Sequence, residues 1–247
     1  MLRNAAIWVV RNIFLRLYVV LGRLFLFPLL YMEYRFQKPA GRAACNERPV
    51  EYTYALTWLA KTCPRKVLDV GSGRSAWPDL VAKCGFHVTA IDKIRGYWRG
   101  DFFNRHYYVK NQDITAPALA GTFDLITCLS VLEHIPDHRA AMDGMLRLLR
   151  TGGHLVLSFP YNERRYVDNV YRLPGVSYGQ DYSFICQVYS REQIDAWLAD
   201  GRGRVIDQAY YEVFVGDLWA FGERLCPPRL VSKDDKHHLT CLVIERT

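Results

Sequence analysis

The sequence lacks several features that would place it in a specialised class of protein. Its seven cysteines are widely spaced, with no Cys-x-x-Cys pair, which argues against a disulfide framework and a zinc site. This usage indicates a reducing, cytosolic compartment. Repeats and low-complexity stretches are also absent. Half of the 247 residues are hydrophobic, so the chain has the composition and length of one globular α/β domain with additions.

A long uninterrupted apolar run is missing as well, although the N-terminus is strongly hydrophobic. Arginines interrupt residues 5–32 before any run reaches the ~18–20 residues of a spanning helix. A secretory signal fits poorly, because Arg11 splits the apolar region. Asn12, Arg16 and Arg23 fall on one narrow stripe of a helix, which favours a helix lying in a membrane interface. The alternatives are packing on protein or a second subunit, or a span in which the arginines find partners.

Charge is unevenly distributed along the chain. Residues 1–43 hold seven basic residues and one acid, so they carry +6 of the net charge of +7 and leave +1 for the other 204 residues. A nucleic-acid substrate is therefore not expected, because such enzymes spread basic charge around their active sites. We divide the chain into a basic hydrophobic segment, 1–43, and one domain, 44–247.

Short apolar runs alternate with helical stretches from Lys66 onward, which predicts an α/β fold with a doubly wound, mostly parallel sheet. The predicted strands are 66–70, 87–92, 106–110, 123–130, 154–159, 204–214 and 239–245. The predicted helices are 76–84, 137–150 and 190–200, the last opened by a Ser190–Gln193 capping box. Residues 33–60 read as a connector and a leading helix, and Cys226-Pro-Pro-Arg reads as a loop.

A glycine-rich turn follows the first predicted strand. Gly71-Ser-Gly73 allows a tight turn and a close approach of the backbone to a ligand, and it also fits the dinucleotide pattern G-x-G-x-x-A. Asp69, two residues before the first glycine, would repel a pyrophosphate and attract a cationic nucleoside. This charge argues against a nicotinamide-dependent oxidoreductase.

Two further acids end the next two predicted strands. Asp92 can accept hydrogen bonds from both hydroxyls of a ribose. Asp113 can accept a hydrogen bond from an adenine amino group, or it can serve as a turn residue in Asp-Ile-Thr. Acids at three successive strand ends suit a cationic nucleoside better than a dinucleotide.

Five motifs in order resemble those of the class I S-adenosylmethionine (SAM)-dependent methyltransferases, and together they cover about residues 66–160. They are VLDVGSG (67–73), AID (90–92), QDI (112–114), FDLITCLSVLEHIPD (123–137) and LLRTGGHLVLSFP (148–160). The resemblance implies a Rossmann-like sheet of seven strands whose last strand is antiparallel, with SAM as cofactor. It implies cofactor roles for Asp69, Gly71, Gly73, Asp92, Asp113, Ile114 and Leu129. Ser75 stands where many members have a third glycine.

The stretch after the fourth strand contains the candidate catalytic residues, His134 and the adjacent Glu133. A histidine that titrates near neutral pH is a natural base for removing a hydroxyl proton, although it can equally be a helix-start residue bonded to the backbone. LEHIPD is similar to the ubiquinone-pathway O-methyltransferases and the small-RNA 2′-O-methyltransferases, which use a metal-binding Glu-x-x-Glu-His pattern. Ser130 replaces the first of those carboxylates here, so we expect no metal.

Residues 160–189 form a long insertion on the substrate side, rich in tyrosine and arginine. We expect Tyr161, Arg164, Arg165 and Tyr166 to contact a polyhydroxylated, aromatic or anionic acceptor. The alternative is that these aromatic residues pack the insertion onto the sheet. Residues 96–103 could form an opposing wall.

These patterns predict O-methylation of a saccharide, a lipid-linked glycan or another hydroxylated metabolite by a cytoplasmic enzyme that is peripheral on the membrane through residues 5–32. A phenolic acceptor of a quinone-like pathway is the alternative, and a non-catalytic SAM-binding protein is the third hypothesis. The intact Asp69/Gly71/Gly73 turn argues against the last.

Overall fold

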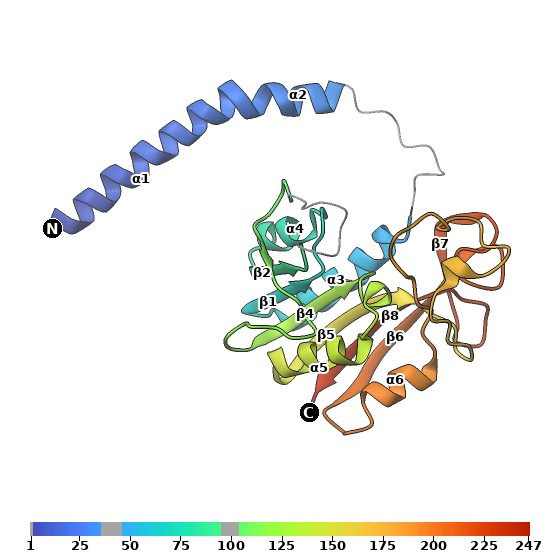
Figure 1. Cartoon of the computed structure of the whole chain (residues 1–247). Helices are drawn as coiled ribbons and strands as arrows, with labels where there is room; N and C mark the ends of the chain where they lie inside the picture. The colour runs from blue at the N-terminus through green and yellow to red at the C-terminus, as the bar shows by residue number, and fades with distance from the viewer. Residues whose placement is uncertain (1, 36–45, 95–103) are drawn as a thin grey trace. The chain divides into compact units, whose positions relative to one another are not determined.

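The computed structural model of the chain describes residues 2–35, 46–94 and 104–247 (Figure 1). The chain forms two compact units, Met1–Ala44 and Cys45–Thr247.

The first unit is helical along its described length. Helix α1 (Leu2–Leu21) runs through a π-helical turn (Gly22–Leu26) into α2 (Phe27–Arg35). Helical structure continues past Pro28 to Arg35. The π-helical turn ends at Leu26, two residues before Pro28, whose ring removes a backbone donor from the helical ladder.

The second unit is built on one sheet of eight strands with the order β3-β2-β1-β4-β5-β8-β6-β7 (Figure 1). The strands are β1 (Lys66–Val70), β2 (His87–Asp92), β3 (Val109–Asn111), β4 (Phe123–Leu129), β5 (Leu149–Pro160), β6 (Gly203–Phe214), β7 (Arg224–Val231) and β8 (Leu239–Arg246). The first five pair in parallel, and β8 is antiparallel to both of its neighbours. The mostly parallel Rossmann-like sheet is therefore confirmed, with eight strands rather than seven.

The additional strand is β7, which includes the segment that we expected to be a loop. Pro227 and Pro228 lie within an irregular stretch of the β6–β7 pairing, between the pairs Phe214–Arg224 and Glu212–Arg229. Proline is tolerated there because an edge strand needs no partner on its outer side and a bulge removes ladder hydrogen bonds.

Helices cover the two faces of the sheet. They are α3 (Arg48–Thr62), α4 (Trp77–Lys83), α5 (His138–Leu148) and α6 (Arg191–Trp197). The capping box predicted at the start of α6 is present, with Ser190 as N-cap and Gln193 as its partner.

Alternate residues of the central strands belong to two separate hydrophobic layers, one on each face of the sheet. Val67 and Leu125 pack with residues of α3 and α4, whereas Leu68 and Ile126 pack with residues of α5 and α6. Side chains alternate along a strand, so a sheet buried on both faces needs apolar residues at nearly every position. This requirement explains the continuous apolar runs in β1 and β4.

Helix α5 approaches the loop after β3 through Gly144. A Cβ atom at this glycine would lie 2.0 Å from the backbone oxygen of Ile114, so the loop must move to accept any side chain. We expect Gly144→Ala to lower the free energy of unfolding by about 1–3 kcal/mol through overpacking. It should also weaken SAM binding, because Ile114 lines the cavity described below.

Denaturant unfolding and calorimetric titration with SAM would measure both effects. Arg139→Ala, at an exposed position of the same helix, is the matched control and should change neither quantity. Unchanged stability and SAM affinity in Gly144→Ala would show that the loop containing Ile114 moves aside without loss of stability, and would contradict this prediction.

Candidate active site

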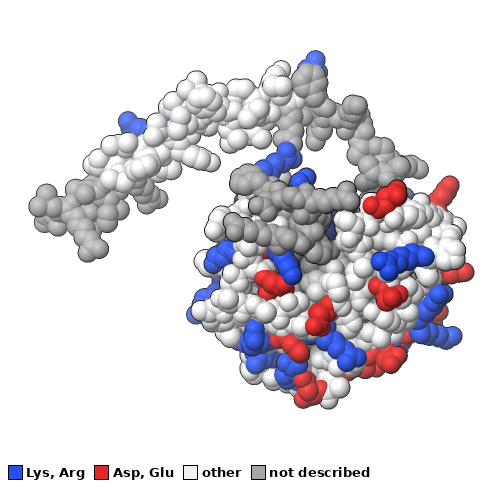
Figure 2. Space-filling model, viewed as in Figure 1, with Lys and Arg blue, Asp and Glu red and all other residues white. Residues whose placement is uncertain are grey.

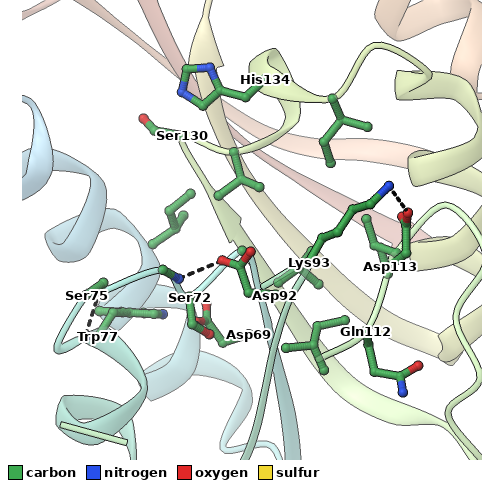
Figure 3. Close-up of a pocket in the computed structure, with 18 of the residues that line it drawn as sticks. Asp69, Ser72, Ser75, Trp77, Asp92, Lys93, Gln112, Asp113, Ser130 and His134 are labelled. Carbon is green, nitrogen blue, oxygen red and sulfur yellow. Dashed lines mark hydrogen bonds and ion pairs between the residues drawn. The ribbon is translucent and has the colours of Figure 1, made fainter. Parts of the chain in front are cut away.

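A cavity of about 700 Å³ lies at the edge of the sheet where the parallel strands β1, β2 and β4 end. Four loops that follow parallel strands line it, together with the first turns of α3. The lining includes all seven residues that the sequence predicted for the cofactor: Asp69, Gly71, Gly73, Asp92, Asp113, Ile114 and Leu129. Figure 3 shows the acids toward one end of this cavity and Ser130 and His134 toward the other.

The glycine turn depends on both of its glycines. Gly71 and Gly73 have φ of 75° and 51°, the left-handed region that favours glycine. A Cβ atom on Gly71 would lie 2.3 Å from a Val131 methyl carbon, so the turn also needs the missing side chain for space. Ser75 replaces the usual third glycine without strain, and its hydroxyl accepts a hydrogen bond (2.9 Å) from the Trp77 amide at the start of α4 (Figure 3).

Asp69 is a buried carboxylate at the end of β1. It accepts hydrogen bonds from the hydroxyls of Ser72 (2.5 Å) and Thr127 (2.8 Å). Burial nevertheless raises the pKa of Asp69 to about 7, because these two hydrogen bonds compensate only part of the lost hydration. Its charge is therefore sensitive to a cation entering the cavity.

The other two acids are held in different ways. Asp92 accepts a hydrogen bond (2.8 Å) from the amide of Gly73, which joins the end of β2 to the glycine turn. Asp113 accepts bonds from the amide and hydroxyl of Thr115 and forms an ion pair (2.7 Å) with Lys93. Although partial burial acts in the opposite direction, these partners lower the pKa of Asp113. Asp113 is therefore a turn residue of Asp-Ile-Thr, which was the alternative to a direct bond with adenine. Its loop nevertheless lines the cavity.

Sequence reasoning missed a buried network between α3 and the sheet. Glu51 is fully buried and accepts hydrogen bonds from the hydroxyls of Ser130 (2.5 Å) and Ser158 (2.7 Å). Its other oxygen forms an ion pair (3.0 Å) with Arg48, whose guanidinium also donates to the Leu129 carbonyl (2.9 Å). Arg48 lines the cavity, so this network places a cation there.

The Arg48–Glu51 spacing of three residues is the only sign of this pair in the sequence. It marks two charges on one face of a helix, which is commonly an exposed face. Contacts with residues 79 and 107 positions away are what bury Glu51.

Ser130 stands where the Glu-x-x-Glu-His pattern has its first carboxylate, and its side chain has a structural partner. The Ser130 hydroxyl is bonded to Glu51 rather than directed to a ligand set. Among residues 2–35, 46–94 and 104–247, no group of three or more His, Cys, Asp and Glu side chains could hold a metal ion.

His134 lines the cavity from a short 3₁₀ turn, Leu132–His134, after β4. Its Nδ1 lies 2.7 Å from the backbone oxygen of Ile185. A carbonyl oxygen only accepts hydrogen bonds, so Nδ1 carries the proton and Nε2 carries the lone pair of the neutral ring. Burial lowers the pKa of His134, against the opposing effect of the Ile185 carbonyl. The ring is therefore neutral at physiological pH.

Glu133, the second predicted catalytic residue, is buried beneath the turn and is not part of the cavity lining. Burial raises the pKa of this carboxyl group well above its usual range. One of its oxygens has no hydrogen-bond partner, and the other lies 3.8 Å from Nε2 of His134.

The four residues predicted to contact the acceptor do not line the cavity. Tyr161 is fully buried and donates a hydrogen bond (2.7 Å) to Glu163. Tyr166 donates to Gln187 (2.8 Å), and Arg164 and Arg165 are exposed. The buried Tyr161 fits the alternative in which aromatic residues pack the insertion onto the sheet. Residues 96–103, the expected opposing wall, lie outside the described residues.

A different part of the insertion contacts the histidine. The ring of Phe184 packs edge-on against His134 with centroids 4.8 Å apart, and Tyr182 stacks on Phe184 at 4.9 Å. Tyr171 packs against Tyr182 at 5.3 Å. An aromatic surface therefore adjoins the imidazole.

Comparisons with known proteins agree with this geometry. The model of the methyltransferase domain family matches residues 41–203. The ubiquinone biosynthesis O-methyltransferase of Xanthomonas oryzae pv. oryzae is 36% identical over 129 residues, which cover 49% of this chain and 52% of the relative. That of Ralstonia nicotianae is 34% identical over 113 residues, covering 42% and 48%. The chain spans about half the length of these curated relatives.

Solved structures share the fold at low sequence identity. One is the Burkholderia thailandensis 1,6-didemethyltoxoflavin-N1-methyltransferase with bound 1,6-didemethyltoxoflavin and S-adenosylhomocysteine. Its TM-score is 0.55 at 15% identity, over 80% of this chain and 78% of the other. Magnesium protoporphyrin IX methyltransferase from Synechocystis, with bound S-adenosylhomocysteine, has a TM-score of 0.50 at 15% identity, over 81% and 84%.

The matched family model covers well over half of the chain, and it spans the glycine turn, the three acids and His134. The chain therefore belongs to the methyltransferase domain family, as a class I SAM-dependent methyltransferase.

Proposed function

We propose that the nucleoside of SAM binds at the end of the cavity formed by Asp92, Asp113 and Ile114. The carboxylate of Asp92 is anchored on the Gly73 amide, where it can accept hydrogen bonds from the ribose hydroxyls. The loop after β3 and Leu129 supply apolar surface for the base. This placement assigns to these residues the roles that the family resemblance implies.

The amino-acid part of SAM then lies toward Asp69, Gly71 and Arg48. The turn at Gly71 leaves the backbone open to close approach, and the buried carboxylate of Asp69 attracts the positive charge of the ligand. The guanidinium of Arg48, held by Glu51 and the Leu129 carbonyl, is a suitable partner for the ligand carboxylate.

This placement predicts that SAM binds more tightly as the pH rises. With a pKa of about 7, Asp69 is mostly protonated at pH 6 and mostly ionised at pH 8, and a cation binds the ionised form. The contribution of Asp69 should strengthen SAM binding by about tenfold between these pH values, with release of a proton on binding. Calorimetry in buffers of different ionisation enthalpy measures both quantities.

Asp69→Asn is the matched control, since it keeps the shape and removes the titration. It should bind SAM weakly and without the proton release attributed to Asp69. An affinity that is the same in the wild type at pH 6 and pH 8 would contradict this placement.

We propose that the acceptor is a phenolic hydroxyl of a small molecule of a quinone-type pathway. The observation that supports this most directly is His134, which lines the cavity and packs against the ring of Phe184. The names of the relatives point to the same class. The residues that we expected to contact the acceptor, whether polyhydroxylated, aromatic or anionic, do not line the cavity: Tyr161, Arg164, Arg165 and Tyr166.

His134 then acts as the general base. When bound, SAM supplies an electrophilic methyl group on a sulfonium. His134 would accept the proton of the acceptor hydroxyl on Nε2 as the methyl group passes from the sulfonium sulfur to the hydroxyl oxygen, with the carbon–sulfur bond broken and S-adenosylhomocysteine as the leaving group. The Nδ1–H bond to Ile185 supports the imidazolium. Glu133, whose pKa is raised by burial and which has an oxygen 3.8 Å from Nε2 of His134, is our candidate for an assisting role.

Purified enzyme with methyl-labelled SAM should transfer label to a catechol acceptor and not to a methyl glycoside. His134→Ala should lower the turnover number by about 100-fold, the range of general-base catalysis, while SAM affinity changes little. Because the pKa of His134 lies below the usual value, the rate should be constant above neutral pH and fall in acid.

Label transfer to the glycoside instead of the catechol would overturn the acceptor class. An unchanged rate in His134→Ala, with catechol methylation intact, would remove this residue as the base.

We also propose that the N-terminal unit attaches the enzyme to the cytoplasmic face of a membrane. The helix Trp8–Met32 has a mean hydropathy of 2.0, and at 1.5 Å per residue it is about 37 Å long, enough by length and composition to cross a bilayer. Its large apolar side chains, including Trp8, Phe14 and Phe25, are exposed. Arg16 and Arg23 within it favour an interfacial position over a spanning one.

On the face of the Cys45–Thr247 unit drawn in Figure 2, acidic and basic side chains are mixed. This mixture supports neither nucleic acid as a partner nor attachment through that face. A membrane-attached enzyme would meet phenolic acceptors that carry hydrocarbon chains.

Deletion of residues 2–35 should move the protein from the membrane pellet to the supernatant, because it removes the exposed apolar surface. Fractionation of cells with both forms measures this, and SAM affinity of the truncated form is the control for folding. Full-length protein in the supernatant would contradict membrane attachment. Release of the full-length protein by alkaline carbonate would separate interfacial from spanning attachment.

A further inference from the structure

The turn that carries His134 is held by one extended part of the insertion. Residues 185, 187 and 189 alternate along this part, and each bonds to the turn. The backbone oxygen of Ile185 binds the His134 ring, and the Tyr189 hydroxyl donates to the carbonyl of Leu132 (2.8 Å). Residues that alternate in an extended chain face the same side, so this contact works like a strand pairing along the turn.

Gln187 makes the largest set of these bonds. Its backbone amide donates to the carbonyl of Glu133 (2.9 Å), and its side-chain amide donates to the carbonyl of Ile135 (2.8 Å). It therefore binds the carbonyl on each side of His134. The side chain of Gln187 is 2% exposed, so it lies away from water that could replace these bonds.

Tyr166 fixes the orientation of the Gln187 amide. Its hydroxyl donates to the Gln187 side-chain oxygen (2.8 Å), so the nitrogen of the same amide is directed to the turn. Tyr166 itself is 38% exposed, on the outer side of the insertion. The sequence analysis assigned Tyr166 to the acceptor, whereas its bond supports the residue behind the base.

We propose that Gln187 is a positioning residue for methyl transfer: through the carbonyls of residues 133 and 135 it holds the His134 ring against the Ile185 carbonyl, in the tautomer with its lone pair on Nε2. Tyr166 supports this role through the Gln187 amide. The proposal rests on the proposed function, in which His134 is the base. A base must be held within a fraction of an ångström of its working position, and a displacement of about 1 Å can lower a rate about 100-fold.

The test compares Gln187→Leu and Tyr166→Phe with the wild type. Gln187→Leu keeps a similar size and removes the side-chain bonds, whereas Tyr166→Phe removes one hydroxyl near the surface. Gln180→Leu is the matched control, because Gln180 lies in the same insertion and donates its amide (2.7 Å) to the Val176 carbonyl, away from the turn.

Turnover with a catechol acceptor and SAM affinity are measured for each protein. We expect Gln187→Leu to lower the turnover number by about 10- to 100-fold and Tyr166→Phe by about 3- to 10-fold. SAM affinity should stay within about twofold, because neither residue lines the cavity. Gln180→Leu should leave both quantities unchanged.

The nitrogen NMR signals of the His134 ring report its tautomer directly. The wild type should show the Nδ1–H form, and both variants should show a mixture of the two neutral tautomers. A purely structural role for Gln187 would lower stability without changing this ring spectrum in the folded protein. If Gln187→Leu does not fold, Tyr166→Phe supplies the same two measurements.

A folded Gln187→Leu with wild-type turnover and an unchanged His134 spectrum would overturn the proposal. Absence of methyl transfer by the wild type to catechol acceptors would count against the proposed function alone. In that case the ring spectra of the variants still decide whether Gln187 positions His134.

Discussion

The buried carboxylate of Glu51 is the interaction on which the arrangement of the cavity depends. A carboxylate taken out of water is costly unless hydrogen bonds and an opposite charge replace its hydration. Here Ser130 and Ser158 supply the hydrogen bonds and Arg48 supplies the charge. Because Ser130 follows β4 and Ser158 lies on β5, this requirement fixes the start of α3 against the carboxyl edge of the sheet. The same bonds hold Arg48 at the cavity.

The cavity consequently has charge of opposite sign at different places along its lining. Asp92 and Asp113 come from the ends of β2 and the loop after β3, and Asp69 comes from the end of β1. The guanidinium of Arg48, on α3, donates to the Leu129 carbonyl at the end of β4, and the ring of His134 is in the turn that follows β4. In the proposed orientation, the hydroxyl-rich nucleoside of SAM faces Asp92 and Asp113, and its zwitterionic amino-acid part faces Asp69 and Arg48. The proposed orientation of SAM follows from this asymmetry.

The parts of the site that were predictable are those governed by topology. Parallel strands end at one edge of their sheet, so acids and glycines after successive apolar runs must meet there. Asp69, Gly71, Gly73 and Asp92 were placed together on this ground, and all of them line the cavity. Their positions follow from local sequence and the order of the strands, without knowledge of side-chain packing.

Residues whose environment is set by long-range packing were not predictable in this way. The Glu51 network joins residues far apart in sequence, and the strand β7 forms because β6 offers an edge for it. Tyr161 was assigned to the acceptor by composition, since tyrosine serves equally in binding sites and in cores. Its buried position directly after β5, beside Glu163, is decided by the packing of the insertion.

The insertion, residues 160–189, shows why composition alone was a poor guide to the residues that contact the acceptor. Its tyrosines and polar residues suggested a surface for the acceptor, but its residues do not line the cavity, and residues 185–189 instead bind the turn that carries His134 through backbone groups and side chains. Ile185 and Gln187 bind the turn of His134, and Phe184 covers one side of the imidazole. In the proposed mechanism, one short segment thus sets both the position of the base and the apolar surface beside it. If that mechanism holds, changes in this segment should alter acceptor choice and proton transfer together, because both would depend on the same few residues.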